Sequence, residues 1–223
     1  MLKFEFSKGN VPLVYPYLIQ NGHEIKKKLI EKKIFGGIYM KDFRVYLRAL
    51  EPEDYKITIN WRNDDEIWSM VGSPKYFVSS EYERQWVIDA IHNPEEIRLG
   101  ICLKENNELI GLASIKDINW INRNAHCPIM MGEKKYWSKG LGSEARLLLL
   151  QFAFYERGFE RSWGLILENN LNSLRMAEKC GYKKEGVFRN SVYKNGKFHN
   201  QVIVSVLREE FDIIAREMGL NYK

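Results

Sequence analysis

The sequence contains few cysteines and histidines, and none of them stands in a spacing that binds metal. Its three cysteines, Cys102, Cys127 and Cys180, are odd in number and form no C-x-x-C pair. This pattern excludes a disulfide framework and a zinc knuckle and is typical of a reducing cytosol. The four histidines show no metal-ligand spacing either. We therefore expect a cytoplasmic protein without a metal ion.

The chain also lacks a long apolar run and a face of one charge. No segment approaches the roughly 18–20 apolar residues of a membrane span, and the N-terminus lacks the apolar core of a secretory signal. The net charge is +5, but 34 basic and 29 acidic residues interleave along the chain. We expect no membrane contact and no nucleic-acid partner, whereas a small anionic ligand fits the sign of the charge.

The 223 residues, of which 45% are hydrophobic, suffice for one globular domain with a small appendage. Residues 1–40 predict an N-terminal arm, which comprises an extended segment at 11–19, an amphipathic helix at 21–33 and a strand at 34–40. A strand-like alternation begins at Phe43 without a low-complexity linker before it. The main domain is therefore expected to span residues 41–223.

The periodicity of this domain predicts an α/β fold around a mostly antiparallel mixed sheet with one parallel crossover. One helix is expected from Pro52 through Trp68, and Ser80 with Glu83 predicts a capping box for a second helix. A proline, Pro128, stands inside one strand, which is typical of an edge or a bulge. The strands are expected at 43–50, 97–120 (a hairpin), 125–132, 161–167, 183–193 and 197–207, and two further helices at about 141–157 and 172–179.

Two glycines, Gly140 and Gly142, stand one residue apart at the start of the most apolar helix. A helix N-terminus attracts anions, and glycine lets a ligand approach the backbone closely. The pair, with Lys139 beside it, therefore suits a pyrophosphate, although two glycines could also merely ease a turn. The G-x-x-x-x-G-K-(S/T) pattern of nucleoside-triphosphate loops and the third glycine of dinucleotide folds are both missing.

The segment Trp137-Ser-Lys-Gly140-Leu-Gly142 is followed about thirty residues later by Asn170–Ser173 and Lys179–Tyr182. These segments resemble the pyrophosphate loop (R/Q)-x-x-G-x-(G/A) and the later N-x-x-S and K-x-G-(F/Y) signatures of the GNAT superfamily of acetyl-CoA-dependent N-acetyltransferases, within its RimJ/RimL-like branch. The resemblance extends from about residue 43 to about residue 210.

The resemblance implies acetyl-CoA as cosubstrate and a splay between the fourth and fifth strands of the domain, with pantetheine in the gap. It also implies direct attack of the amine, with a backbone N–H between Ile129 and Met131 stabilising the thioester oxygen. The cofactor-binding residues that it implies are Ile129, Met130, Met131, Trp137, Ser138, Lys139, Gly140, Leu141, Gly142, Ser143, Asn170, Ser173 and Lys179.

The candidate catalytic residues depart from the pattern of the family more than the cofactor-binding residues do. His126 stands where many relatives carry a glutamate base, and a histidine titrates near neutrality; a structural histidine, with ordered water as the base, is the alternative. Ser173 is the candidate acid for the thiolate, because Ala177 replaces the usual tyrosine; alternatively it only satisfies helix donors. The carboxylate that some relatives carry in the penultimate strand is also missing, since the chain reads Asn190–Val192 there.

Trp61, Arg62 and Tyr193 are expected to line the acceptor site, where an exposed Trp-Arg pair could bind an anionic acceptor. The alternative places Trp61 in the core and Arg62 in a surface ion pair. Residues 11–35 resemble the C-terminal tail of DegT-type nucleotide-sugar aminotransferases, which makes an amino-sugar nucleotide the leading acceptor. Other small-molecule or peptide amines, namely polyamines and protein N-termini, stay open, as do a homodimer and a CoA-binding module without catalysis.

Overall fold

The computed structural model describes residues 37–38, 43–218 and 220 of the chain. The structure divides into two units, residues 1–34 and 35–223, and the described residues all belong to the second. The extended segment and the helix predicted at 11–33 thus lie outside the described residues. Of the predicted strand at 34–40, Gly37–Ile38 form the short strand β1, which pairs with β2.

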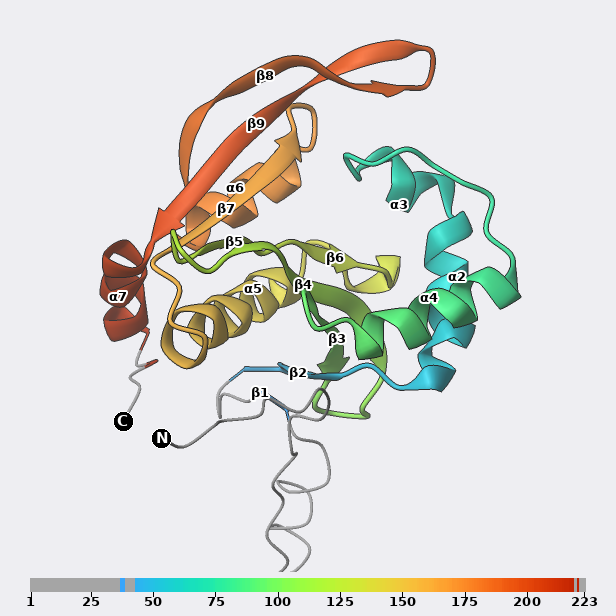
Figure 1. Cartoon of the computed structure of the whole chain (residues 1–223), viewed down its shortest axis with the longest axis horizontal. Coiled ribbons are helices and arrows are strands. Elements are labelled where there is room, and N and C mark those ends of the chain that lie inside the picture. The colour runs from blue at the N-terminus through green and yellow to red at the C-terminus, as the bar shows by residue number, and fades with distance from the viewer. Residues whose placement is uncertain (1–36, 39–42, 219, 221–223) are drawn as a thin grey trace, which may run out of the picture. The chain divides into compact units, whose positions relative to one another are not determined.

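A mixed sheet runs through the second unit in the order β1-β2-β3-β4-β5-β7-β9-β8, and β6 pairs with β4 beside this path (Figure 1). Among the described strands, β5 and β7 form the parallel pair, and the other pairs are antiparallel. The predicted α/β fold is thereby confirmed. The strands are β2 (Val45–Ala49), β3 (Ile97–Leu103), β4 (Leu109–Asn119), β5 (Asn124–His126), β6 (Ile129–Met131), β7 (Arg161–Leu167), β8 (Lys183–Lys194) and β9 (Lys197–Leu207).

The helix predicted from Pro52 to Trp68 is wrong as a single element. The chain instead forms the short turn η1 (Pro52–Asp54), α2 (Tyr55–Asn63) and α3 (Asp65–Ser69). Asp64 causes the break, because its carboxylate accepts hydrogen bonds from the N–H groups of Glu66 and Ile67 and so caps a new helix.

The capping box predicted for α4 (Ser80–His92) is also wrong. Ser79 caps this helix, since its hydroxyl accepts the N–H of Tyr82 at 3.2 Å. Glu83 is instead fully buried, and it pairs with a side chain of α2. The remaining helical elements are η2 (Lys134–Tyr136), α5 (Leu141–Gln151), the π-helical turn η3 (Phe152–Glu156), α6 (Leu171–Lys179) and α7 (Arg208–Glu217), of which η2 and α7 were not predicted.

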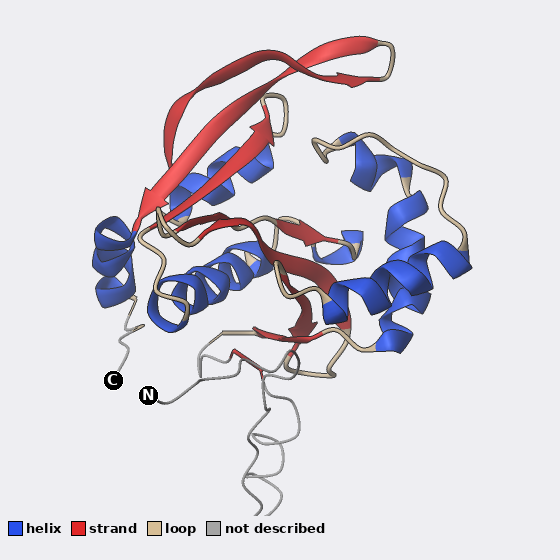
Figure 2. Cartoon of the chain, viewed as in Figure 1, coloured by secondary structure: helices blue, strands red, loops and turns tan. Residues whose placement is uncertain are grey.

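The core lies between the sheet and α5, which packs against β2, β4 and β6 (Figure 2). The run Leu147–Leu150 is buried on this helix together with Ala145. Helix α6 packs beside α5, whereas α2 and α4 pack on each other next to β3. The glycine-headed end of α5 thus lies close to β6, where the predicted splay begins.

Candidate functional site

The predicted splay begins at the junction of β5 and β6. Strand β5 pairs with β7 up to His126↔Trp163, and the N–H of Cys127 makes a last bond to the carbonyl of Trp163 at 3.4 Å. Pro128 interrupts the strand there, and β6 continues beside β4 alone. Because β5 is paired with β7 up to the residue before Pro128, the gap between β6 and β7 opens toward their carboxyl ends.

The register of β6 decides which of its backbone groups face this gap. The N–H of Ser114 bonds the carbonyl of Pro128 at 3.0 Å, and the N–H of Gly132 bonds the carbonyl of Ile110 at 2.9 Å. Bonded and non-bonded pairs alternate in an antiparallel ladder, so Met130 points its backbone toward β4. The N–H groups of Ile129 and Met131 therefore point into the splay. This register excludes the backbone of Met130 from the predicted donors.

The loop from Trp137 to Gly140 turns the chain from the end of β6 into α5. The indole N–H of Trp137 donates to the carbonyl of Met131 at 2.9 Å, which fixes the loop to the edge of the splay. Ser138 and Gly140 adopt the left-handed backbone with φ of 59° and 83°. The N–H groups of Ser143 and Glu144 bond the carbonyl of Gly140.

Helix geometry then leaves the N–H groups of Leu141 and Gly142 without an intrahelical acceptor. These donors, with the positive end of the helix dipole, suit a phosphate group at this position. The side chain of Leu141 is buried in the core, while those of Ser138 and Lys139 are exposed. The loop therefore offers backbone donors and one lysine to a ligand.

The two glycines have different roles. Gly140 holds a positive φ that costs other L-residues about 1–2 kcal/mol. A Cβ on Gly142 would lie 3.0 Å from the sulfur of Met176 and 3.5 Å from Cγ of Met131. The missing side chain of Gly142 thus lets α5 approach both α6 and β6, and any larger group would fill the space next to the splay.

Arg44, which the sequence interpretation missed, holds this loop from the start of β2. Its guanidinium pairs with Glu144 in the first turn of α5 and donates to the carbonyl of Lys139 at 2.9 Å. The side chain is 57% exposed and adds positive charge beside Gly140. No motif marks it, because 95 residues separate it from the carbonyl that it binds.

The second predicted motif lies at the start of α6. The side chain of Asn170 accepts the N–H of Ser173 at 3.1 Å and donates to the carbonyl of Met70, also at 3.1 Å. Ser173 is half-buried. Lys179 is exposed at the other end of α6, about 9 Å along the axis from Ser173. The structure therefore separates Lys179 from this end of the helix.

His126 lies at the vertex of the splay, on the last paired residue of β5. Its side chain is 15% exposed, stacks on Trp163 with ring centroids 4.7 Å apart, and places Nδ1 3.4 Å from a carboxylate oxygen of Asp117. Burial and the positive charge of Lys116 lower the pKa of His126 to about 4, although Asp117 acts in the opposite direction. The imidazole is therefore neutral at pH 7 and able to accept a proton.

The predicted exposed Trp-Arg pair does not exist in the structure. Trp61 is only 2% exposed and donates its indole N–H to Glu133 at 2.9 Å. Arg62 forms an ion pair with the buried carboxylate of Glu83 at 3.1 Å and stacks on Trp86 at 4.2 Å. Trp61 thus follows the alternative considered from the sequence, since it packs in a core cluster with Tyr46 and Leu109 of the sheet. Arg62 forms the ion pair of that alternative, but with a buried carboxylate of α4 and not at the surface.

Tyr193 is 61% exposed on the β8–β9 hairpin, and its ring packs edge-on against Phe198 at 5.2 Å. The neighbouring Lys194, which the sequence did not single out, donates from Nζ to the carbonyls of Trp68 and Val71. Burial lowers the pKa of this lysine. The hairpin is thereby fastened to the loop after α3.

That loop also contacts the start of α6 and the middle of β9. The side chain of Asn170 binds the carbonyl of Met70, and a Cβ on Gly72 would lie 2.6 Å from the side chain of Gln201. The loop after α3, the N-terminus of α6 and the hairpin consequently meet over the carboxyl-terminal half of β7. The first helices and the last hairpin are the elements that the sequence predicted for the acceptor side.

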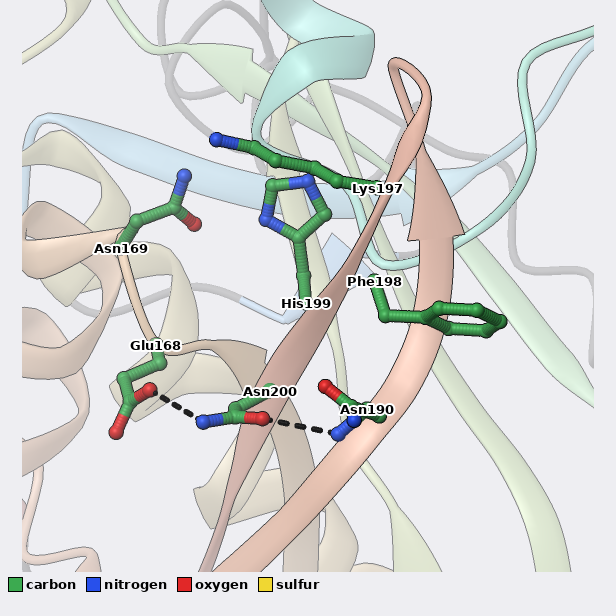
Figure 3. Close-up of a pocket in the computed structure, with 7 residues that line it drawn as sticks. All are labelled: Glu168, Asn169, Asn190, Lys197, Phe198, His199 and Asn200. Carbon is green, nitrogen blue, oxygen red and sulfur yellow. Dashed lines mark hydrogen bonds between the residues drawn. The ribbon is translucent and has the colours of Figure 1, made fainter.

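A polar pocket of about 360 Å³ opens where β7 ends (Figure 3). Asn200 donates to the carboxylate of Glu168 at 2.9 Å and accepts the backbone N–H of Asn190 at 2.9 Å. The rings of His199 and Phe198 point to different sides of β9. The residues that line the pocket are Glu168, Asn169, Asn190, Lys197, Phe198, His199 and Asn200.

Within the described ranges, no group of three or more His, Cys, Asp or Glu side chains could hold a metal ion. A search of the same residues finds no helix long and apolar enough to cross a membrane.

Comparison with known proteins agrees with this geometry. Residues 44–183 match the family model of the acetyltransferase (GNAT) domain, so the chain belongs to the GNAT acetyltransferases. It is 29% identical over 167 residues to the SPbeta prophage-derived uncharacterized N-acetyltransferase YokL of Bacillus subtilis (strain 168), covering 75% of this chain and 92% of that protein. The protein is accordingly an enzyme of the N-acetyltransferase type.

Two spermidine acetyltransferases are similar to this chain at lower sequence identity. The spermidine N(1)-acetyltransferase of Escherichia coli (strain K12) is 22% identical, with 75% of this chain and 88% of that protein covered. The crystal structure of spermidine N-acetyltransferase from Vibrio cholerae in complex with CoA and spermine superposes with a TM-score of 0.70 at 23% identity, over 75% of this chain and 98% of that one. At this identity the superposition shows the shared fold.

Proposed function

We propose that this N-acetyltransferase transfers the acetyl group of acetyl-CoA to the primary amine of an amino-sugar nucleotide. The observation that carries the acceptor is the polar pocket at the end of β7. Asn169, Asn190 and Asn200 line it with one carboxylate and one lysine. The amide of Asn200 already bonds Glu168 and the backbone of Asn190, so Asn169 and Asn190 are the amides offered to an acceptor. Neutral amides donate and accept hydrogen bonds at once, which suits hydroxyl-rich rings, whereas a polyamine calls for several carboxylates.

The pocket and the vertex of the splay lie on the same strand. Glu168 follows β7 by one residue, and Trp163, at the vertex, lies five residues before it. At the rise of a strand this separation is about 16 Å. An acceptor that reaches both the vertex of the splay and the pocket must be elongated, with its amine near His126 and the rest of the molecule in the pocket. A sugar joined to a nucleotide has this shape.

The residues around the splay support binding of acetyl-CoA. The unpaired N–H groups of Ile129 and Met131 suit the pantetheine amides and the thioester oxygen, and the N–H groups of Leu141 and Gly142 suit the pyrophosphate. In this proposal, neutral His126 takes the proton of the attacking amine and Ser173 lies near the sulfur. Asn170, by contrast, already uses its amide to cap α6 and to hold Met70.

A second acceptor class, the polyamines, is favoured by the names of the spermidine acetyltransferases among the relatives. The resemblance of residues 11–35 to a nucleotide-sugar aminotransferase tail favours the amino sugar instead. The two acceptors make different demands on the pocket, because a polycation gains little from neutral amides. Protein N-termini follow as a third class.

Release of CoA thiol should be measured with uridine-diphosphate amino sugars, spermidine and N-terminal peptides in parallel. We expect the highest kcat/KM with an amino-sugar nucleotide. Asn169→Ala and His199→Ala should raise the KM for that acceptor and leave the KM for acetyl-CoA unchanged. Asn122→Ala, an exposed asparagine in the turn before β5, is the matched control.

His126→Ala should lower kcat with every acceptor by about 100-fold, which is the usual contribution of a general base. Full activity of that variant would show that solvent, and not His126, takes the proton of the attacking amine. Turnover of spermidine alone, insensitive to Asn169→Ala, would replace the amino sugar by a polyamine.

A further inference from the structure

Arg146 is a buried cation without a carboxylate partner. It lies in the second turn of α5, only 5% exposed, and forms no ion pair with any residue that the structure describes. Its Nε is enclosed and lacks a hydrogen-bond partner there. Burying a cation without an opposite charge costs several kcal/mol, of which the contact with the ring of Tyr182 offsets a part. A neutral residue of similar volume would therefore stabilise the fold more. The stability of the fold therefore does not explain why an arginine stands at this position.

The guanidinium lies beneath the vertex of the splay. It stacks on the ring of Tyr182 at 5.1 Å, and the hydroxyl of Tyr182 is 2.6 Å from that of Ser162 on β7. Ser162 pairs with Ala125, two residues before the last rung at Cys127. Arg146 is thus connected through two side chains to the point where β5 and β7 part.

The charge acts on the groups around the vertex. It lowers the pKa values of Cys127, Cys180 and Tyr182, opposing the increase that burial causes, and it contributes to the low pKa of His126. The other charged groups near His126 are Lys116 and the carboxylate of Asp117, which is 55% exposed. On the side of α5, the potential at the vertex is therefore positive.

Acetyl transfer develops negative charge at this place. The lone pair of the amine forms the C–N bond, the C–S bond breaks, and its electron pair leaves on the sulfur of CoA, while the surplus proton of the nitrogen passes to His126 or to water. The thiolate takes up a proton before or after it departs. On the face of α6 turned to the core, Ala177 offers no polar group to this sulfur.

We propose that Arg146 provides, through space, the positive charge that stabilises the departing CoA thiolate. This inference rests on the proposed binding of acetyl-CoA in the splay, and it does not depend on which acceptor is used. A positive potential stabilises a thiolate more strongly in a buried, low-dielectric site than in water. The same potential favours the neutral form of a bound amine.

The test measures the acidity of bound CoA without any acceptor. The thiolate of CoA is titrated by its ultraviolet absorbance in complex with the wild type, Arg146→Met and Arg146→Lys. The matching complexes with desulfo-CoA are subtracted, so that the protein thiols cancel. Arg189→Met, which removes an exposed arginine on β8, is the control.

We expect the thiol in the wild-type complex to titrate at lower pH than in Arg146→Met by about one unit, with Arg146→Lys close to the wild type. With any accepted amine, kcat should fall about tenfold or more in Arg146→Met, while the affinity for CoA should stay within about twofold. The melting temperature of Arg146→Met should rise, because the buried charge is removed.

Equal thiol titration in the wild type and Arg146→Met would overturn the proposal. A lower melting temperature that Arg146→Lys restores, with unchanged thiol acidity, would assign Arg146 a purely structural role. Failure of the wild type to bind CoA would instead contradict the proposed cosubstrate site. The failure of this proposal and the failure of the proposed function are therefore distinguishable.

Discussion

The two sides of the splay differ in how they are built. On the proposed CoA side, residues 137–143 form a loop of consecutive backbone in which Leu141 and Gly142 have no intrahelical acceptor for their N–H groups and Gly140 has a φ of 83°. On the proposed acceptor side, the surface comes from the loop after α3, the start of α6 and the β8–β9 hairpin. These segments meet through contacts such as Lys194 with Trp68, which span 126 residues.

A site made of consecutive backbone is therefore fixed by local conformation, whereas a site made of distant side chains depends on packing. Arg44 shows that even the CoA loop needs a long-range support, since it holds the carbonyl of Lys139. Four variants test whether the two sides are built in these different ways.

Trp61→Ala should show that this residue belongs to the core of the acceptor side. Its ring fills the space above Gly132, where a Cβ would lie 2.0 Å from it. We expect a loss of about 3–5 kcal/mol in the free energy of unfolding, measured by urea denaturation. Tyr193→Ala, an exposed aromatic on the hairpin, is the control and should change stability by less than about 0.5 kcal/mol. A stable Trp61→Ala variant with a raised acceptor KM would restore Trp61 as a binding residue.

Gly142→Leu should disable the CoA side and leave the fold intact. A side chain at this position meets Met176 and Met131, and overpacking of this kind costs about 1–3 kcal/mol. We expect the Kd for acetyl-CoA, measured by calorimetry, to rise about 100-fold. Gly186→Leu on β8, where a Cβ would make only an ordinary contact with Ile203, should bind normally. An unchanged Kd for acetyl-CoA in Gly142→Leu would show that acetyl-CoA does not bind in the splay next to Gly142.

Low pH should reduce the free energy of unfolding, because His126 is buried in its neutral form at the vertex of the splay. The folded-state pKa of about 4 lies below the unfolded value of about 6.5, so the unfolded chain binds the proton more readily. The resulting stabilisation is complete above pH 6.5 and is lost as the pH falls toward 4, with a magnitude on the order of 3 kcal/mol. Comparing urea denaturation at pH 7.5 and 4.5 in the wild type and His126→Gln checks this. An equal pH dependence in both proteins would contradict the buried neutral imidazole.

Lys194→Met should have the smallest effect. It releases the carbonyls of Trp68 and Val71 and so loosens the loop after α3 from the hairpin. We expect the acceptor KM to rise about tenfold, as for the loss of one or two hydrogen bonds to a charged group, while the acetyl-CoA KM stays constant. Lys184→Met, which removes an exposed lysine on β8, serves as the matched control. A change in acetyl-CoA KM instead would show that the two sides are coupled.

Much of the fold could be predicted from the sequence because periodicity is a local property. The hairpin of β3 and β4, the apolar helix α5 and the interruption at Pro128 all follow from residues adjacent in the chain. The errors in the predicted helices occur where a side chain binds a partner that the local pattern does not indicate. Asp64 caps a new helix and so divides the predicted one, and Glu83 forms an ion pair with Arg62 instead of capping α4.

The class of the protein follows from local sequence, since the loop from Trp137 to Ser143 and the later Asn170–Ser173 motif stand on the elements expected for an acetyltransferase. The unpaired N–H groups of β6, the burial of Trp61 and the place of Arg146 beneath the vertex follow only from the folded chain. Backbone conformation depends on near neighbours. Burial, ladder register and electrostatic potential are instead set by residues far apart in the chain.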